Sequence, residues 1–168
     1  MKKSIKFLLI ILIFTSCSNS DGALLKGIKR KVIEQADIAQ KNGKEYSLFK
    51  MSSVTDFKWE KFYVFDEFLS DKNISDIIGI EWNGRTVPSG NKRLLFINKG
   101  EVIRYVDLEM DSFPITFNTC EPIEQDEYKK QDDVFAVFQY CSKNGCFYEL
   151  IPARCIENFL KLKQRNAR

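Results

Sequence analysis

Two tight β-hairpins constrain the fold of this chain more than any other feature of its sequence. In the first, mostly apolar residues at 93–98 and 102–108 flank Asn98-Lys99-Gly100-Glu101, where Gly100 can take the positive φ that a tight turn requires. Strands joined by so short a turn must be antiparallel. The run Leu94-Leu95-Phe96-Ile97 has no polar position, which predicts an interior strand covered on both faces.

A second hairpin is expected toward the C-terminus. Residues 134–141 and 146–151 are rich in β-branched and aromatic side chains, and Ser142-Lys143-Asn144-Gly145 supplies a turn between them. The segment 121–133, which separates the two hairpins, is acidic and is interrupted by Pro122. We therefore expect a loop there.

Helices are expected at three places around these strands. Residues 23–41 are amphipathic and end at Asn42-Gly43, with an apolar stripe of Leu25, Ile28, Val32, Ala36 and Ala39. Ser70 is a favourable N-cap for a short helix that ends at Gly79 and turns inward Ile74, Ile77 and Ile78. Pro152 is expected to open the last helix, whose apolar side comprises Ile156, Phe159 and Leu160.

The order of these elements predicts the fold class. Short aromatic segments at residues 46–51 and 59–65 add two strands between the first and second helices. The resulting order is typical of an α+β fold, with a largely antiparallel sheet, an N-terminal amphipathic helix, a short middle helix and a C-terminal helix. Since neither a linker nor an internal repeat interrupts residues 23–168, we expect them to form a single α+β domain.

The N-terminus has the features of a secretory signal peptide. Lys2, Lys3 and Lys6 form a basic start, and an unbroken apolar run at 7–14 precedes the small residues Thr15 and Ser16. A membrane-spanning helix needs about 20 apolar residues, so this run is too short for a permanent span. We expect residues 1–16 to be removed.

The residues Phe14-Thr15-Ser16-Cys17 resemble the lipobox of bacterial lipoproteins. The resemblance implies that Cys17 is lipidated, with acyl chains such as palmitate, and becomes the mature N-terminus, while residues 17–22 form a tether. The alternative is a soluble secreted protein with a plain thiol at Cys17. By the same resemblance, Ser18 favours the periplasmic face of the outer membrane in a Gram-negative cell, and the outer face of the single membrane otherwise.

A second resemblance covers residues 23–115. The stretch 55–65, Ile77-Ile78-Gly79 followed by Trp82, and the apolar hairpin 94–103 resemble a group of small bacterial lipoproteins without an agreed activity. These proteins share a Trp-acid-Lys-x-Tyr-x-Phe strand and a Gly-x-x-Trp element. The resemblance implies an envelope location and a fold, and it names no activity.

Apart from Cys17, the cysteines are even in number: Cys120, Cys141, Cys146 and Cys155. In an exported protein such a set favours disulfides over metal binding. Cys141 and Cys146 flank the second hairpin turn and are expected to pair, which leaves Cys120 for Cys155. A zinc site built from all four thiolates is the alternative, although only one close pair is present.

Composition excludes several function classes. The chain has no histidine, which removes Ser/His/Asp and Cys/His nucleophile pairs and every histidine-containing metal site. Lys and Arg total 26 against 23 Asp and Glu, and removal of the three signal lysines balances the two. A nucleic-acid partner is therefore not expected.

Aromatic and acidic side chains are the remaining candidates for a site. Trp59, Tyr63 and Trp82, with Phe65, could form an exposed stacking platform for a glycan or peptide, or they could belong to the core. Acidic groups that could act as paired carboxylates or calcium ligands occur at Asp66-Glu67, Asp132-Asp133 and residues 121–127. We expect them to be solvated charges in turns and loops.

The sequence thus favours a lipid-anchored cell-envelope protein that binds an envelope protein or a glycan and is not an enzyme. No catalytic residue, metal or cofactor is assigned. One alternative is an inhibitor or exclusion factor that acts on a wall-active enzyme or a phage component. Another is an envelope enzyme with a carboxylate- or tyrosine-based site.

Overall fold

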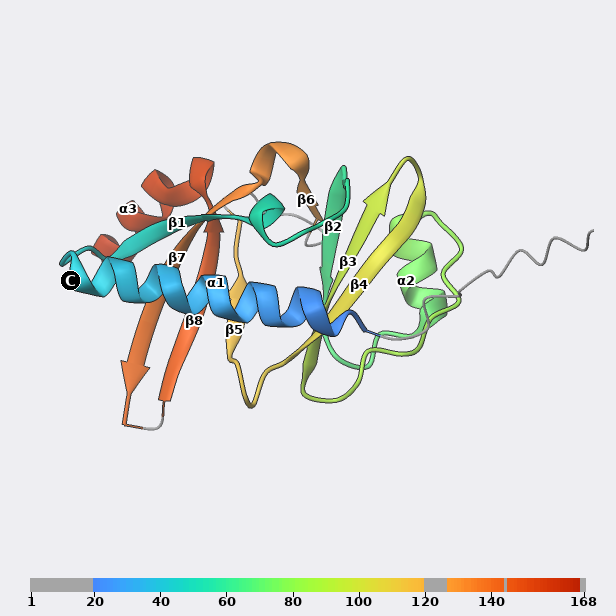
Figure 1. Ribbon diagram of the computed structural model, residues 1–168, viewed down its shortest axis with the longest axis horizontal. Coiled ribbons are helices and arrows are strands. Elements are labelled where there is room, and N and C mark those ends of the chain that lie inside the picture. Colours follow the sequence, from blue (N-terminus) through green and yellow to red (C-terminus); the bar gives the residue numbers. More distant parts are fainter. Residues whose placement is uncertain (1–19, 120–126, 144, 167–168) are drawn as a thin grey trace, which may run out of the picture.

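The computed structural model describes residues 20–119, 127–143 and 145–166. Two four-stranded sheets lie along the long axis, and helices pack on them (Figure 1). In chain order the elements are α1 (Gly22–Lys41), β1 (Tyr46–Lys50), η1 (Met51–Ser53), β2 (Lys61–Phe65), α2 (Asp71–Ile78), β3 (Asn91–Asn98), β4 (Glu101–Glu109), β5 (Ile115–Phe117), β6 (Glu127–Lys129), η2 (Lys130–Asp132), β7 (Val134–Ser142), β8 (Gly145–Pro152), η3 (Ala153–Cys155) and α3 (Ile156–Asn166), where η denotes a 3-10 helix.

The strands divide into sheet A, with order β1-β7-β8-β5, and sheet B, with order β4-β3-β2-β6. The pairings are antiparallel except that β5 runs parallel to β8. The α+β class and the C-terminal helix are confirmed, whereas the strands expected in one sheet form two. The chain passes from one sheet to the other four times, after β1, β4, β5 and β6.

The inner faces of the two sheets meet in a central core. Alternation along β7 illustrates this, because Phe135 and Val137 point into the central core while Ala136 and Phe138 point to the outer face. Phe62 of β2 stacks on Tyr128 of β6 with ring centroids 4.9 Å apart. These aromatic contacts join β2 and β6 within sheet B and reach β7 of sheet A.

Each sheet also has an outer face that a helix covers. On sheet B, α2 buries Ile74 and Ile78 against Tyr63 and Leu95. On sheet A, the residues that follow β8 pack Cys155, Ile156, Phe159 and Leu160 against Phe138. Both outer faces therefore have apolar clusters of their own.

Helix α1 runs in front of both sheets (Figure 1). The Asp21 side chain caps it by accepting from the backbone N–H groups of Ala23 and Leu24, at 3.0 and 2.9 Å. Four members of the predicted stripe are buried, namely Ile28, Val32, Ala36 and Ala39. Leu24, at 3% exposure, is more buried than the predicted Leu25, which packs at the margin of the core.

The two hairpins are confirmed. Lys99 and Gly100 both have positive φ, 51° and 76°, as a two-residue turn of type I′ requires. Beyond this turn, Phe96 pairs with Arg104 and Ile97 with Val102, so Ile103 is the extra residue of a β-bulge. Residues 94–97 are at most 1% exposed in an interior strand, as their unbroken apolar character predicts.

The short middle helix also follows its sequence signals. The Ser70 hydroxyl accepts from the Asn73 N–H at 3.2 Å, and Gly79 ends the helix in the left-handed conformation with φ 68°. The predicted Ile74 and Ile78 are buried, and Ile77 is partly buried against the same cluster.

Other boundaries differ from the sequence-based expectation. Pro152 is the last residue of β8 and does not open the helix, which begins at Ile156 after a 3-10 turn. The segment expected to be a loop contains β6 and η2, because Tyr128 pairs with Phe62 and buries its ring in the central core. None of the helices among the described residues has the length and apolar character needed to cross a bilayer.

Candidate functional site

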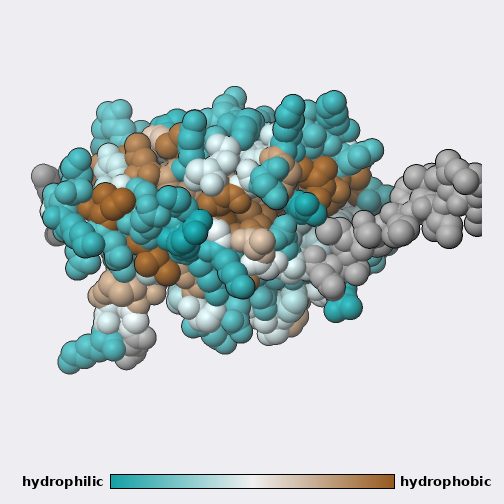
Figure 2. Space-filling model, in the orientation of Figure 1, coloured by the Kyte–Doolittle hydropathy of each residue, from teal (hydrophilic) through white to brown (hydrophobic). Residues whose placement is uncertain are grey.

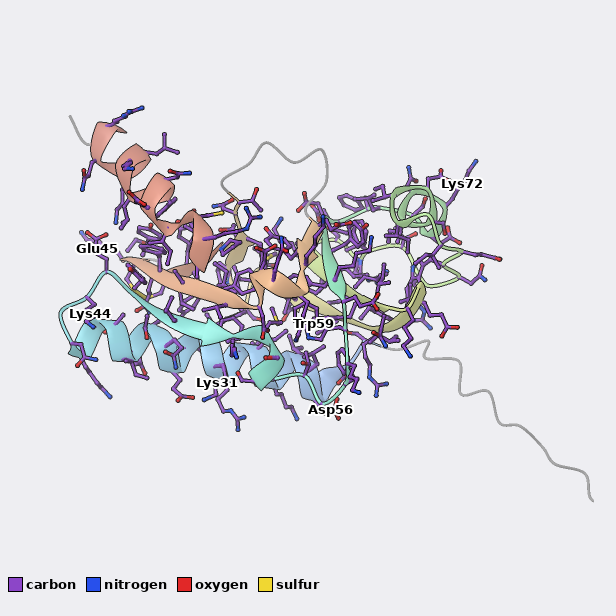
Figure 3. All side chains as sticks on the ribbon, turned by 90° about the horizontal axis from the view of Figure 1, so that it is seen from above. Lys31, Lys44, Glu45, Asp56, Trp59 and Lys72 are labelled. Carbon is purple, nitrogen blue, oxygen red and sulfur yellow. A yellow bond between two sulfur atoms is a disulfide. The ribbon has the colours of Figure 1, made fainter. Side chains whose placement is uncertain are left out.

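Of the two roles considered for Trp59, Tyr63 and Trp82, an exposed platform or the core, the structure shows the core. Trp59 is 3% exposed in the central core, where its indole N–H donates to Thr55 Oγ1 at 3.2 Å, and Figure 3 shows it near the middle of the molecule. Tyr63 is 4% exposed on the opposite, outer face of sheet B. Trp82 lies on that outer face too, with its ring edge against Tyr105. Because sheet B is covered on both sides, these side chains contribute to two cores.

A polar cluster forms where β2 and β6 pair. The Tyr63 hydroxyl donates to the Glu127 carboxylate, and the Lys61 ammonium donates to Glu127 at 3.0 Å and to the Tyr63 oxygen at 2.9 Å. Lys129 adds a longer ion pair with Glu127, at 3.8 Å. Lys61 and Tyr63 point to the same face of β2, opposite Lys129 and Glu127 in the register, so strand pairing alone assembles the group.

In this cluster the pKa of the carboxyl is lowered, and the pKa values of the phenol and the ammonium group are raised. Partial burial would raise the pKa of the Glu127 carboxyl, but hydrogen bonds from Tyr63 and Lys61 outweigh it and lower that pKa. Burial and the Glu127 carboxylate raise the pKa of Tyr63. Burial would lower the pKa of Lys61, yet its bonds to Tyr63 and Glu127 raise it. At neutral pH the cluster is thus a protonated phenol held between fixed opposite charges.

A second polar group lies on the outer face of sheet A. Glu149 is 9% exposed and accepts from the Tyr140 hydroxyl at 3.0 Å and from the Asn118 amide. Burial and the nearby Glu149 carboxylate raise the pKa of Tyr140. The Tyr140 ring stacks on Phe147, so this group joins β7 to β8 and to the end of β5.

The acidic pairs differ in their surroundings. Asp132, at 4% exposure, pairs with Arg154 at 2.5 Å, and Asp133 accepts from the Ser52 N–H and hydroxyl at 2.7 and 2.6 Å. The expectation of solvated charge is therefore wrong for these two, because they connect η2 to η1 and to η3. Asp66 and Glu67 are exposed, as expected. Of the acidic residues at 121–127, only Glu127 lies among the described residues, and it too is partly buried.

The cysteines follow the disulfide prediction as far as they are described. Cys141 and Cys146 form a disulfide across the hairpin, with Cα atoms 4.0 Å apart. This pairing contradicts the zinc alternative, which needs both thiolates. Cys155 is buried and disulfide-bonded, while its predicted partner Cys120 and the lipidation site Cys17 lie outside the described residues. No group of three or more potential metal ligands occurs within the described segments.

The described surface carries an apolar groove where α1 ends and β1 begins, here called the β1 groove. Ile38 and Ala39 of α1 form one wall, Tyr46 and Leu48 of β1 the floor, and Leu160 of α3 the other wall. Its volume is about 670 Å³. Ile38 and Leu48 are 38% and 49% exposed, and Figure 2 shows brown, hydrophobic surface at this end of the molecule.

The floor of the β1 groove is a strand edge with unpaired backbone groups. Among the strands of the described residues, β1 pairs with β7 alone. The Met51 N–H donates to the Asp133 carbonyl at 2.8 Å, in register with the β1–β7 ladder. Alternate residues of a strand turn their backbone groups to opposite sides, so Tyr46, Leu48 and Lys50 turn theirs away from β7. Tyr46 and Leu48 thus offer N–H and C=O groups at this edge, and Lys50 offers its N–H alone, because its carbonyl accepts from the Ser53 hydroxyl at 2.6 Å.

Lysines flank this edge at both ends. Lys44 precedes β1 and Lys50 ends it, both are exposed, and neither forms an ion pair within the described residues. Glu45, in contrast, pairs with Lys163 of α3 at 3.3 Å. Figure 3 shows Lys44 and Glu45 at the turn between α1 and β1. The free strand edge therefore lies between two unpaired positive charges.

Sequence reasoning missed the β1 groove. Of the exposed apolar residues that lie off the buried stripe of α1, Ile38 lines the groove and Ile33 does not. Single exposed apolar residues are common on protein surfaces, so Ile38 alone does not reveal a groove in the sequence.

Comparison with protein-family models, with curated proteins and with solved structures gives no match for this chain. The interpretation of the site therefore depends on its geometry and chemistry.

Proposed function

We propose that this chain is a lipid-anchored cell-envelope protein that binds another protein through the β1 groove and performs no catalysis. One observation carries the proposal: the β1 groove lies at the C-terminal end of α1, whereas the chain enters the domain at the N-terminal end. A 20-residue helix is about 30 Å long. A protein attached to a membrane through Cys17 would hold the groove away from the lipid surface.

The entering chain is also fixed to sheet B, which supports a defined orientation. The Asp21 N–H donates to the Tyr105 carbonyl at 3.0 Å, and the Ser20 hydroxyl accepts from the Asp107 N–H at 2.8 Å. Both bonds are made to β4 before α1 begins. From Ser20 onward, these bonds and helix α1 connect the chain to the groove, so residues 20–22 belong to the domain and not to the expected tether.

Lipidation at Cys17 is the proposed means of attachment. Each buried methylene of an acyl chain contributes about 0.8 kcal/mol, so several chains on one residue hold a protein stably on a membrane. In a Gram-negative cell the proposed location is the periplasmic face of the outer membrane. The proposed partner is an envelope protein in reach of that surface.

A second candidate, an inhibitor or exclusion factor, is favoured by the β7–β8 hairpin. The hairpin extends beyond the body of the molecule (Figure 1), and the Cys141–Cys146 disulfide holds its end together. Phe147 is 36% exposed beside it. A rigid protruding hairpin with an exposed aromatic side chain could enter the cleft of another protein. The enzyme alternative gains no such support, because the Glu127 pKa is lowered and the Tyr63 pKa is raised.

Crosslinking in intact cells followed by mass spectrometry tests the proposal. The native protein is compared with Cys17→Ala and with Ser18→Ala, which keeps the cysteine. We expect acylated Cys17 and one abundant envelope protein with the native chain and with Ser18→Ala, and loss of both membrane attachment and partner with Cys17→Ala. Membrane attachment of Cys17→Ala would refute the anchor. Confirmed acylation without any protein partner would refute the protein-binding role.

A further inference from the structure

We infer that the β1 groove takes an extended peptide segment of a partner protein, which adds to sheet A as a fifth strand along the free edge of β1. This inference rests on the proposed binding function and names the form of the ligand. It follows from the backbone of β1, the shape of the groove and the charges at its ends.

The backbone of β1 favours a strand over any other form of ligand. Tyr46 and Leu48 each turn an N–H and a C=O group toward the groove, and Lys50 adds an N–H at the end of the same edge, at the alternate spacing of a β-ladder. An added strand can pair with these groups, whereas a helix has already used its own backbone groups internally. Main-chain hydrogen bonds would supply affinity, and the apolar walls would select side chains.

The concave shape argues against a second copy of this chain as the occupant. A twofold dimer through β1 would bring the same surface of each copy together. The walls of the β1 groove, Ile38 on α1 and Leu160 on α3, stand on either side of the strand edge. In such a dimer the walls of one copy would meet the walls of the other and keep the two edges apart. A single extended chain is narrow enough to lie between them.

The chemistry of the groove describes the peptide. Ile38, Leu48 and Leu160 would contact apolar side chains, which alternate with outward-pointing polar ones in a strand. Lys44 lies just before the five-residue strand β1 and Lys50 is its last residue, so one ammonium group flanks each end of the strand edge. Because both ammonium groups lack an ion-pair partner within the described residues, the peptide is expected to carry acidic residues near both ends. The ligand class is thus an alternating apolar segment with acidic flanks.

A displayed library of random twelve-residue peptides tests this inference on the full chain in detergent. We expect selection of peptides with alternating apolar residues and flanking Asp or Glu. Hydrogen exchange then reports the geometry, because a bound strand should slow exchange of the outward amides of Leu48 and Lys50 by at least tenfold. Failure to select any peptide, or selection of peptides that do not slow these amides, would overturn the inference.

Substitutions separate edge pairing from simple apolar contact. Leu48→Pro removes the leucine side chain and an N–H that does not bond to β7, whereas Leu48→Ala removes the side chain alone. Both should leave β1 paired, and Leu48→Pro should bind the selected peptides at least fivefold more weakly than Leu48→Ala. Ile38→Asp should weaken binding of the selected peptides by a similar factor, because it removes an apolar side chain from one wall of the groove. Leu162→Asp is the matched control, since Leu162 is 56% exposed on α3 outside the groove, and it should change affinity less than twofold. Equal affinity for the native chain, Leu48→Pro and Ile38→Asp would refute the inference.

The charges provide a variant that does not alter the strand. Lys44→Glu combined with Lys50→Glu should weaken the selected acidic peptides at least fivefold and favour peptides with basic ends in a new selection. An unchanged preference for acidic ends would contradict the assigned contacts. All these measurements use isolated protein and peptide, so they stand apart from the anchor test: an unattached protein that still selects strands would refute the lipid anchor alone.

Discussion

The two sheets of this protein differ in how completely their outer faces and edges are covered. On sheet B, α2 and the residues that follow it bury Ile74 completely, and the same face contains Arg93, at 1% exposure. On sheet A, α3 covers less, and Leu48 and Phe147 remain 49% and 36% exposed. The strands of sheet B carry more charged residues than those of sheet A, so the closer covering of sheet B comes from the segments packed on it and not from more apolar strands.

This difference suggests a division of labour between stability and binding. A buried outer face adds apolar contacts and allows a buried ion pair to form, and both make sheet B resistant to local opening. An incompletely covered sheet leaves apolar side chains and a free edge available to a partner. The fold therefore has a well-covered sheet B near Ser20, where the chain enters the domain, and a partly covered sheet A at the C-terminal end of α1.

The largest expected effect on stability comes from a substitution in sheet B. Arg93 donates to both carboxylate oxygens of Asp107, at 2.7 and 2.9 Å, and packs over the Tyr105 ring. Arg93→Ala would leave Asp107 without its main partner and should lower the free energy of unfolding by about 3–5 kcal/mol. Urea denaturation measures the change. Lys92 neighbours Arg93 on β3 and forms an exposed ion pair with Asp66, which follows β2. Lys92→Ala should lower the free energy of unfolding by less than about 1 kcal/mol.

A matched isoleucine pair compares the two covering helices directly. Ile74→Ala in α2 removes a fully buried side chain and should cost about 3 kcal/mol. Ile156→Ala at the start of α3 removes a partly buried one and should cost about 1 kcal/mol. Thermal unfolding of both variants measures the difference. Equal losses of stability in the two variants would show that α3 covers sheet A as completely as α2 covers sheet B.

The smallest expected effect is the pH dependence that Glu127 contributes. Its pKa is lower in the folded protein than the ordinary 4.5, so its stabilising contribution is present above pH 4.5 and is lost as the pH falls through the folded value. Lys61 has a raised pKa, so its contribution is present below pH 10.5 and is lost as the pH rises through the folded value. Both groups are partly exposed, which limits each contribution to about 1 kcal/mol or less.

Urea unfolding at a series of pH values measures the fall in stability at low pH, here called the acid limb, and the fall at high pH. Glu127→Gln should flatten the acid limb, while Glu34→Gln, on an exposed pair of α1, should leave it unchanged. An identical acid limb in the native chain and in Glu127→Gln would show that this cluster makes no net contribution to stability.

Much of the fold was predictable because local signals agreed with tertiary structure. The span of α1, the Ser70 cap and both hairpin turns depend on residues close together in the chain. The short strands β5 and β6 were not predicted, because three residues carry too little pattern and form a strand only by pairing with β8 and β2. The division into two sheets depends on the same distant pairings.

The site was less predictable than the fold. The burial of Tyr63, however, follows from a rule that was applied to another strand. Residues 94–97 were assigned to a strand covered on both faces because they lack polar positions, and the run Phe62-Tyr63-Val64-Phe65 has the same character. The same reasoning predicts burial of Tyr63 and removes the platform. The free edge of β1, in contrast, has no local signature, because strand order is set by contacts distant in sequence.

The four passages of the chain between the sheets affect how the protein is made. Synthesis proceeds from the N-terminus, and β1 leaves the ribosome about ninety residues before β7, the strand with which it pairs in sheet A. Sheet B can assemble from the strands made up to β6, whereas sheet A must wait for the last hairpin. A chain stopped before residue 134 would therefore expose β1 along both edges, and quality-control proteases and chaperones would meet that half of the molecule first.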